Sequence, residues 1–275
     1  MSLSSMKTMF VDTSIGRMAL SARNAVELVR VACRSPESVG TLANDQLATY
    51  LVTRLCSPGK GFIDIGAHIG SIVSEVIHRD PSIKLYAIEP MPEKISHLRQ
   101  RFPTVELHEC ALGDVDGEVP FFVNTKQSGF SSLGRPTSFE GVETIRVPLK
   151  RLDAIISSDD IDVIKIDVEG AELGVFRGGD ALIKRSRPTL MFESGPRVDD
   201  SLEYKKDSMW RWLEEREFDI VVPNRVAHNG SGLSLDGFLE AHVYPRRTTN
   251  YFAIPKERRI EVRNRARAAL GIAVT

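Results

Sequence analysis

The sequence has only three cysteines, Cys33, Cys56 and Cys110, and none of them belongs to a Cys-x-x-Cys pair. Zinc ribbons and thioredoxin-like redox sites need such pairs, so we expect reduced thiols in a cytoplasmic protein. The chain also lacks an excess of either charge, because 36 Lys and Arg are balanced by 37 Asp and Glu. This balance argues against a bulk electrostatic nucleic-acid binder, so no nucleic-acid partner is predicted.

Long apolar runs are missing as well. After Lys7 the chain is interrupted by Asp12 and Arg17, so we expect neither a signal peptide nor a transmembrane segment. A chain of 275 residues suits one α/β core with appendages, since single cores stop growing at about 250–300 residues. The predicted organisation is a helical segment, an α/β domain and a basic helix, over residues 1–57, 58–255 and 256–275.

Two nucleotide-binding fingerprints are absent. The sequence contains neither the Gly-x-Gly-x-x-Gly of dinucleotide folds nor the Gly-Lys-Ser/Thr loop of P-loop proteins. Residues 61–70 instead hold a short apolar run that ends at Asp64, followed by Ile69, Val73 and Val76 at helical spacing. This pattern predicts a buried strand, a glycine turn and a helix.

The glycine turn suits a nucleoside ligand that carries no phosphate. Gly66 can adopt a positive φ and lets a ligand approach the backbone, while the start of the next helix offers free N–H groups. An acid such as Asp64 is no handicap to S-adenosylmethionine and can help to hold its ammonium group. That cofactor fits best, and a structural glycine turn in another α/β protein is the alternative.

A second strand is predicted over residues 83–88, and it ends at Glu89. An acid about 20 residues beyond the glycine loop is placed to accept both ribose hydroxyls of a nucleoside. Pro90 and Met91 follow and are candidates to flank the adenine. The tip of the third strand borders the same crevice in a doubly wound sheet, so Ala111 is a candidate to contact the adenine edge.

A central strand is predicted over residues 161–166 and includes Lys165. Lysine is almost never buried alone, so Lys165 needs a carboxylate partner nearby. Asp167, Glu169 and Glu172 follow at the carboxyl end of this strand, where ligands bind in such sheets. We expect Asp167, more than either glutamate, to face the crevice. The glutamates are alternatively placed to complement the dipole of the next helix.

Weaker predictions concern the flanks and an insertion. An apolar helical face over residues 15–33, which includes Val26 and Val29, is expected to pack on the sheet; capping the cofactor site or lying against a partner are the alternatives. Asp116-Gly117 predicts a hairpin turn, and a polar insertion over residues 124–141 either covers the site or is a surface loop. Further strands are expected over residues 105–110, 119–123, 144–149, 189–192, 219–222 and 250–254. The arginines of the C-terminal helix are expected to be solvated.

Seven motifs between roughly residues 61 and 195 resemble a known family. They are Phe62 to Gly70, Ile88 to Pro90, Ala111 to Asp114, Ser128 to Leu133, Arg151 to Asp153, Ile164 to Glu172 and Pro188 to Glu193. On these motifs the chain resembles the FkbM family of S-adenosylmethionine-dependent methyltransferases. The block from Lys165 to Glu172 is the most specific, and His68 departs from the Asn that is typical of the family.

The resemblance implies a Rossmann-like class I methyltransferase fold in the α/β class, with a seven-stranded, mostly parallel sheet whose last strand is antiparallel, plus N-terminal helices. It also implies S-adenosylmethionine as cofactor and a small-molecule hydroxyl acceptor such as a sugar, a glycolipid or a polyketide. The residues assigned to the cofactor are Asp64, Gly66, Ala67, His68, Gly70, Glu89, Pro90, Met91 and Ala111.

A hydroxyl acceptor has to lose its proton, so the catalytic candidates are Asp167 and His68. His68 is attractive because the unperturbed pKa of histidine is near ~6.5. A metal-assisted variant, in which Asp167 and Glu193 hold Mg²⁺ against the acceptor oxygen, ranks lower, and no metal ligand is assigned.

Three alternatives stay open. A base-modifying amino methyltransferase would carry an Asn/Asp-Pro-Pro-aromatic motif where Asp167 is followed by Val168-Glu169-Gly170. A nicotinamide oxidoreductase is disfavoured by the missing dinucleotide fingerprint. A module that binds S-adenosylmethionine without catalysing transfer is the third.

Overall fold

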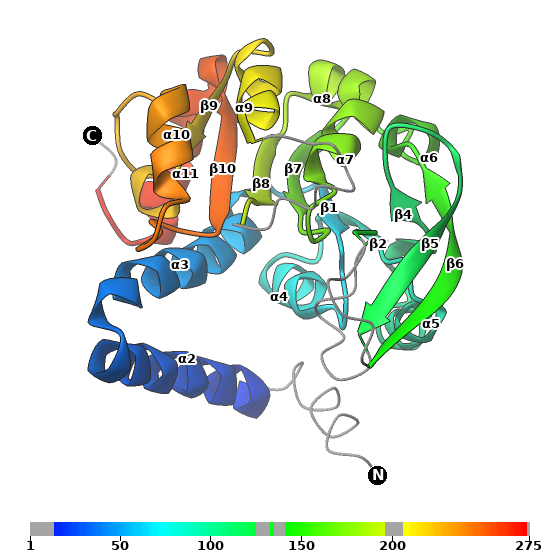
Figure 1. The fold of residues 1–275 in the computed structure, drawn as a ribbon, viewed down its shortest axis with the longest axis horizontal. Coiled ribbons are helices and arrows are strands. Elements are labelled where there is room, and N and C mark those ends of the chain that lie inside the picture. The colour runs from blue at the N-terminus through cyan, green and yellow to red at the C-terminus, as the bar shows by residue number, and fades with distance from the viewer. Residues whose placement is uncertain (1–13, 125–132, 135–140, 196–205, 274–275) are drawn as a thin grey trace.

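The large sheet of this protein has seven strands and helices on both faces (Figure 1). A computed structural model describes residues 14–124, 133–134, 141–195 and 206–273. In spatial order the strands are β3 (Glu106–His108), β2 (Lys84–Ile88), β1 (Gly61–Ile65), β7 (Ile161–Ile166), β8 (Thr189–Glu193), β10 (Asn250–Pro255) and β9 (Phe218–Val221). Strand β10 is antiparallel to both of its neighbours, and the other pairs are parallel. The predicted fold class is confirmed.

Two layers of helices cover the sheet. The helices are α2 (Ser14–Arg34), α3 (Val39–Leu55), α4 (Ser71–Arg79), α5 (Pro92–Arg101), α6 (Leu152–Ile155), α7 (Glu172–Gly178), α8 (Asp180–Ser186), α9 (Lys206–Glu214), α10 (Leu235–Ala241) and α11 (Arg259–Ala269), with short 3₁₀ turns at η1 (Pro36–Ser38), η4 (Pro223–Arg225) and η5 (Lys256–Arg258). Phe62 packs with α3, α4, α5 and α11, whereas Ile63 packs with α7 to α10. Alternate residues of a strand point to opposite faces, so a fully buried strand such as β1 contributes to both layers. In the described part of the chain no helix combines the length and apolarity needed to cross a bilayer.

Strand register brings the functional segments to one edge. Asp64 of β1 pairs with Lys165 of β7, and Ile65 pairs with Ile88 of β2. Parallel strands in this register end together, so the chain leaves β1, β2 and β7 at the same carboxyl edge.

A second sheet of three strands stands beside the first. Its order is β4 (Ala111–Leu112), β6 (Val142–Lys150) and β5 (Gly117–Asn124). The hairpin predicted at Asp116-Gly117 is wrong, because β6 separates the strands on either side of that turn. The antiparallel pair is β5 with β6, joined through the predicted insertion. Residues 125–132 and 135–140 of that insertion, with most of the Ser128 to Leu133 motif, lie outside the described residues.

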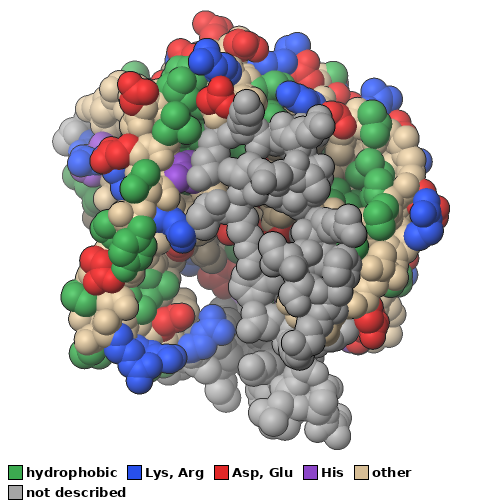
Figure 2. All heavy atoms as spheres, in the orientation of Figure 1, with side chains coloured by type: hydrophobic (Ala, Val, Ile, Leu, Met, Phe, Trp, Pro, Cys, Tyr) green, Lys and Arg blue, Asp and Glu red, His purple; other side chains and the backbone are tan. Residues whose placement is uncertain are grey.

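Helix α2 lies apart from the sheet, at the lower edge of Figure 1. Val26 and Val29 are 68% and 64% exposed, so the prediction that this apolar face packs on the sheet is wrong. The half-buried face is instead the one with Leu28 and Val31. Periodicity finds an apolar face but does not say whether anything covers it. Lys and Arg side chains gather along this part of the molecule (Figure 2).

The C-terminal helix α11 packs against α3 through Val262 and Ala266, which are buried. Two arginines near it reach Asp162 at the start of β7: Arg265 Nη1 lies 2.7 Å from its Oδ2, and Arg258 pairs with its Oδ1. The prediction of a solvated arginine face is therefore wrong for these two. The segment boundaries after residues 57 and 255 stay predictions.

Candidate active site

A cavity of about 380 Å³ opens at the carboxyl edge of the large sheet. Sites for small molecules typically enclose about 300–1,000 Å³, so its size suits a cofactor. The predicted cofactor residues that line it are Gly66, Ala67, His68, Glu89, Pro90 and Ala111. The predicted catalytic residue Asp167 lines it too, so the tips of β1, β2 and β7 meet at one site.

Glu89 is a buried acid of the cavity whose two carboxylate oxygens both accept hydrogen bonds. It is 3% exposed, and its Oε2 accepts a hydrogen bond from the His68 N–H at 2.9 Å while Oε1 accepts one from the Met91 N–H at 3.2 Å. Lys94 Nζ lies 3.7 Å from Oε1. Burial raises the pKa of Glu89, and Lys94 and the two N–H groups oppose that rise. A carboxylate has about four lone-pair sites, so acceptor capacity is left for a ligand diol.

Three predicted cofactor residues, Met91, Gly70 and Asp64, do not line the cavity. The Met91 side chain packs with Phe121 and Leu149 of the small sheet, so Met91 acts on the site through its N–H to Glu89. At Gly70, where φ is +80°, a Cβ would lie 2.6 Å from side-chain atoms of Leu98 and Phe102. Glycine at that position serves the packing of α4 on α5, and direct cofactor contact by Met91 or Gly70 is not supported.

Gly66 adopts the predicted positive φ, and the structure adds a second reason for a glycine there. Its φ is +76°, and a Cβ there would lie 1.9 Å from the backbone oxygen of Asp167. The glycine therefore permits the close approach of the β1 and β7 tips. The cavity lies beside that contact.

Asp64 and Lys165 form a buried pair behind the cavity. Lys165 Nζ lies 3.1 Å from Asp64 Oδ1 and donates to the Gly66 carbonyl oxygen at 3.0 Å. Asp64 is 0% exposed and is not among the residues that line the cavity. The predicted direct contact of Asp64 with the cofactor is therefore not supported. Asp64 acts through Lys165, and burial raises the pKa of Asp64.

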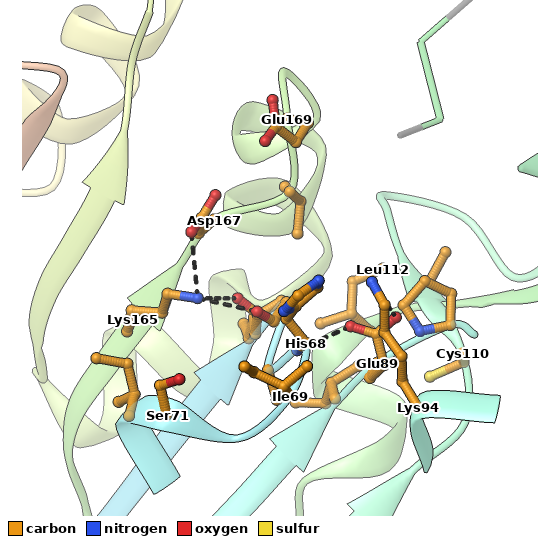
Figure 3. Close-up of a pocket in the computed structure, with 18 of the residues that line it drawn as sticks. His68, Ile69, Ser71, Glu89, Lys94, Cys110, Leu112, Lys165, Asp167 and Glu169 are labelled. Atoms are coloured by element: carbon orange, nitrogen blue, oxygen red, sulfur yellow. Dashed lines mark hydrogen bonds and ion pairs between the residues drawn. The ribbon is translucent and has the colours of Figure 1, made fainter. Parts of the chain in front are cut away.

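Lys165 also reaches the acid at its own strand tip. Its Nζ lies 3.4 Å from Asp167 Oδ2, and Figure 3 shows the two side chains pointing toward one another. Asp167 is hydrogen-bonded to Glu193. Burial and the adjacent Asp167 charge raise the pKa of Glu193 to about 10. Burial also opposes ionisation of Asp167, but the Lys165 charge and the Glu193 hydrogen bond hold its pKa below the usual value. At neutral pH Glu193 therefore donates its proton to an ionised Asp167.

Glu169 and Glu172 have different surroundings. Glu169 lines the cavity together with Asp167, whereas Glu172 is buried and its Oε1 accepts the N–H groups of Val168 and Gly170, both at 3.2 Å. Burial raises the pKa of Glu172 to about 7. Glu169 thus faces the crevice as Asp167 does, and Glu172 shapes the loop. Asp167, Glu169 and Glu193 place ligand atoms within 4.8 Å of one another, a donor set that suits a hard cation.

His68 lies between the Lys165–Asp167 pair and the Glu89–Lys94 pair (Figure 3). Burial, followed by the charges of Lys94 and Lys165, lowers its pKa to about 4. The unperturbed pKa near ~6.5 that made His68 attractive is therefore not its value in this site, and its catalytic role stays a prediction. A neutral imidazole at physiological pH is suited to hydrogen bonding with a ligand more than to storing a proton.

Lys94, Thr49 and Asn250 are among the lining residues that sequence reasoning missed. Lys94 lies on the first turns of α5 shortly after Glu89, a position that could have signalled the pair. Thr49 of α3 and Asn250 of β10 lie far away in the sequence, and no local pattern marks them. Only the packing of α3 and β10 beside the central strands brings them to the cavity.

Known proteins support one family assignment. The model described as "Methyltransferase FkbM domain" matches residues 64–220. The 2-O-methyltransferase NoeI of Sinorhizobium fredii is 28% identical over 158 residues, which cover 50% of this chain and 64% of that protein. The methyltransferase sdnD of Sordaria araneosa is 29% identical over 160 residues, 45% of this chain and 62% of that protein. The chain thus spans about three fifths of the curated relatives it matches.

Among solved structures, one methyltransferase is similar to most of this chain. The crystal structure of the methyltransferase FkbM from Methylobacillus flagellatus KT covers 86% of this chain and is itself 60% covered, at 20% identity and a TM-score of 0.49. The family model spans more than half of the sequence and includes the tips of β1, β2 and β7. The chain belongs to the FkbM methyltransferase family.

Proposed function

We propose that the protein transfers the methyl group of S-adenosylmethionine to a hydroxyl oxygen of a small molecule such as a sugar, a glycolipid or a polyketide. The observation that carries this proposal is one cavity lined by both Glu89 and Asp167 in a chain of a methyltransferase family. The relative NoeI, named as a 2-O-methyltransferase, supports oxygen as the accepting atom.

The cavity fits the cofactor at its β2 end. Glu89 offers two oriented carboxylate oxygens to the ribose hydroxyls, and Pro90, Ala111 and Leu112 offer a mainly apolar wall for an adenine. When bound there, S-adenosylmethionine supplies a methyl group already activated by a positively charged sulfur. Most of the catalysis can then come from holding the acceptor in place, where effective molarities reach about 10⁵ M or more.

Asp167 is the residue we assign to the acceptor proton. Lys165 and Glu193 hold its carboxylate from two sides, and the carboxylate lines the cavity in its ionised form. It can accept the hydroxyl hydrogen bond and then the proton. His68, neutral at physiological pH, orients the acceptor or the cofactor by hydrogen bonding.

Cofactor binding is expected to depend on Glu89. Glu89→Gln removes the charge and half of the acceptor atoms, so the Kd for S-adenosylhomocysteine should rise about 10- to 100-fold, since hydrogen bonds to charged groups contribute about 1.5–3 kcal/mol. Isothermal titration calorimetry measures this directly. Glu93→Gln, an exposed acid on the first turn of α5, is the matched control. Equal affinity in all three proteins would refute the assignment of Glu89.

The non-catalytic alternative makes a different prediction. Such a module would bind S-adenosylmethionine in calorimetry but would label nothing when incubated with the methyl-labelled cofactor and an extract of the source cells. An O-methyltransferase labels a product whose methyl group is attached to oxygen, which mass spectrometry identifies.

A Mg²⁺-assisted route is the second candidate, because three carboxylates gather at Asp167. Glu193→Gln separates the routes. The Gln amide still donates to Asp167, so without a metal the rate should stay within about threefold of wild type, equivalent to about 0.6 kcal/mol. If Glu193 were a metal ligand, the loss of its carboxylate would instead weaken metal binding and lower the rate strongly.

The rates of wild type, Glu193→Gln and Glu193→Ala are measured with and without EDTA. We expect chelator-insensitive activity, with only Glu193→Ala slowed, because it removes one of the two donors that hold Asp167. Activity that EDTA removes and Mg²⁺ restores would overturn the metal-free route.

A further inference from the structure

The start of β10 is held by one carboxylate from a distant helix. Asp45 of α3 accepts hydrogen bonds at Oδ1 from Thr248 Oγ1 at 2.7 Å, the Thr249 N–H at 2.9 Å and the Asn250 N–H at 3.2 Å. Its Oδ2 accepts from Thr249 Oγ1 at 3.0 Å. This network fixes the backbone of β10 where the strand reaches the cavity.

The same carboxylate fixes the direction of the Asn250 amide. Asn250 Nδ2 donates to Asp45 Oδ1 at 3.3 Å and to Thr249 Oγ1 at 3.2 Å. An ionised carboxylate only accepts hydrogen bonds, so the NH₂ side of the amide must face Asp45. Both amide hydrogens are then used. Among the described residues, no donor reaches the amide oxygen Oδ1, which is the group left for the cavity that Asn250 lines.

Asn250 also lies next to the proposed proton acceptor. It is the register partner of Glu193 across β8 and β10, and Glu193 is hydrogen-bonded to Asp167. Asp167 and Asn250 therefore bring oxygen acceptors to the same cavity from the ends of β7 and β10, with β8 between them. The lysines among its described lining residues lie beside carboxylates, Lys94 by Glu89 and Lys165 by Asp64 and Asp167.

We propose that Asn250 binds the methyl acceptor, accepting a hydrogen bond from a second hydroxyl of a polyhydroxylated molecule while Asp167 receives the hydroxyl that is methylated. Asp45 is the positioning residue, because it turns the Asn250 amide oxygen toward the ligand. Acceptor oxygens on the cavity wall favour a ligand rich in hydroxyl donors. A ligand that carries carboxylates or phosphates is disfavoured, because its negative charge repels the Asp167 carboxylate and its oxygens offer no hydrogen to the wall. This inference rests on the proposed methyl transfer to oxygen and narrows its substrate class.

The acceptor class can be tested before the acceptor is purified. Source-cell extract is treated with sodium periodate, which cleaves vicinal diols, and the excess is quenched with ethylene glycol. A control extract receives periodate that was quenched beforehand. With methyl-labelled S-adenosylmethionine and wild-type protein, the control extract should become labelled and the oxidised extract should not. Equal labelling of both would overturn the polyhydroxylated acceptor while leaving methyl transfer established.

The role of Asn250 is tested in the control extract at several dilutions. Asn250→Ala should raise the apparent KM for the acceptor about tenfold, with kcat and the calorimetric Kd for S-adenosylhomocysteine nearly unchanged. Asn224→Ala, an exposed asparagine in η4, is the matched control and should behave as wild type. An unchanged acceptor KM in Asn250→Ala would overturn its role in binding.

Asp45→Asn tests the positioning step. An amide at residue 45 no longer dictates which way Asn250 faces, so the acceptor KM should rise as in Asn250→Ala. The double variant should be no worse than Asn250→Ala alone, because the two residues act through one hydrogen bond. Additive effects would overturn the positioning role of Asp45. If wild type labels nothing in the control extract, the methyltransferase proposal fails and this inference falls with it.

Discussion

Replacing Asp167 with alanine or asparagine is expected to lower kcat by about 10²- to 10⁴-fold, the usual contribution of a positioned general base. The reason is that Asp167 is the ionised carboxylate of the cavity, held by Lys165 and by the Glu193 proton. Asn keeps the size of the side chain but does not accept a proton. Labelled methyl transfer at saturating cofactor measures kcat, and calorimetry should find S-adenosylhomocysteine binding nearly unchanged in Asp167→Asn.

The control for Asp167 is Asp159→Asn, whose side chain is 78% exposed outside the cavity. Full activity of Asp167→Asn would exclude Asp167 as proton acceptor.

The wild-type pH profile gives a second check. Because the pKa of His68 is lowered to about 4 and that of Glu193 is raised to about 10, neither of these two residues should produce an inflection in activity near pH 6.5. It should fall at high pH, as Glu193 loses the proton that it donates to Asp167.

Replacing Lys165 with methionine is expected to destabilise the fold by about 3–5 kcal/mol, the cost of leaving a buried charge without its partner. Asp64 is fully buried, and its carboxylate depends on the Lys165 ammonium at 3.1 Å. Chemical denaturation at neutral pH measures the loss. Lys184→Met removes an exposed lysine from a surface pair with Asp180 and should change stability by less than about 1 kcal/mol.

The pH dependence of Lys165→Met follows from Asp64. Without the lysine, burial and the Asp167 charge both act to raise the pKa of Asp64, so its folded-state pKa lies above its unfolded value. Folding then takes up a proton between these two pKa values, and the stability deficit grows as pH rises through that window. Below the unfolded pKa Asp64 is protonated in both states, so the deficit should shrink. Asp64→Asn combined with Lys165→Met should recover part of the stability, and no recovery would contradict the pairing.

Much of the sheet was predictable from local pattern. The apolar runs that end at Asp64, Glu89 and Asp167 are buried strands, and strands of this kind end at one edge when they are parallel. The need of Lys165 for a carboxylate also followed from the sequence, because a charge inside an apolar strand has to be paired. These predictions depend on hydrophobic periodicity and on the cost of burying a charge, and both can be read from a short stretch of sequence.

The site was predicted less completely. Glu89, Pro90 and Ala111 line the cavity as expected of cofactor residues, but their contacts with the cofactor stay predictions. Asp64 and Met91 were assigned by their place in the chain, yet Asp64 is covered by Lys165 and the Met91 side chain packs into the small sheet. Strand register and side-chain direction decide such contacts. Neither can be read from the position of a residue next to a sequence motif.

The sequence by itself determined the order of strands and helices, the glycine turn and the acids at the strand tips, because these follow from hydrophobic periodicity and backbone chemistry over a few residues. Only the tertiary structure decided that the pKa of His68 is lowered, that Glu193 donates to Asp167 and that Asp45 turns Asn250 toward the cavity. Those properties arise from desolvation and from charges on segments far apart in the chain, and such neighbours exist only once the chain has folded.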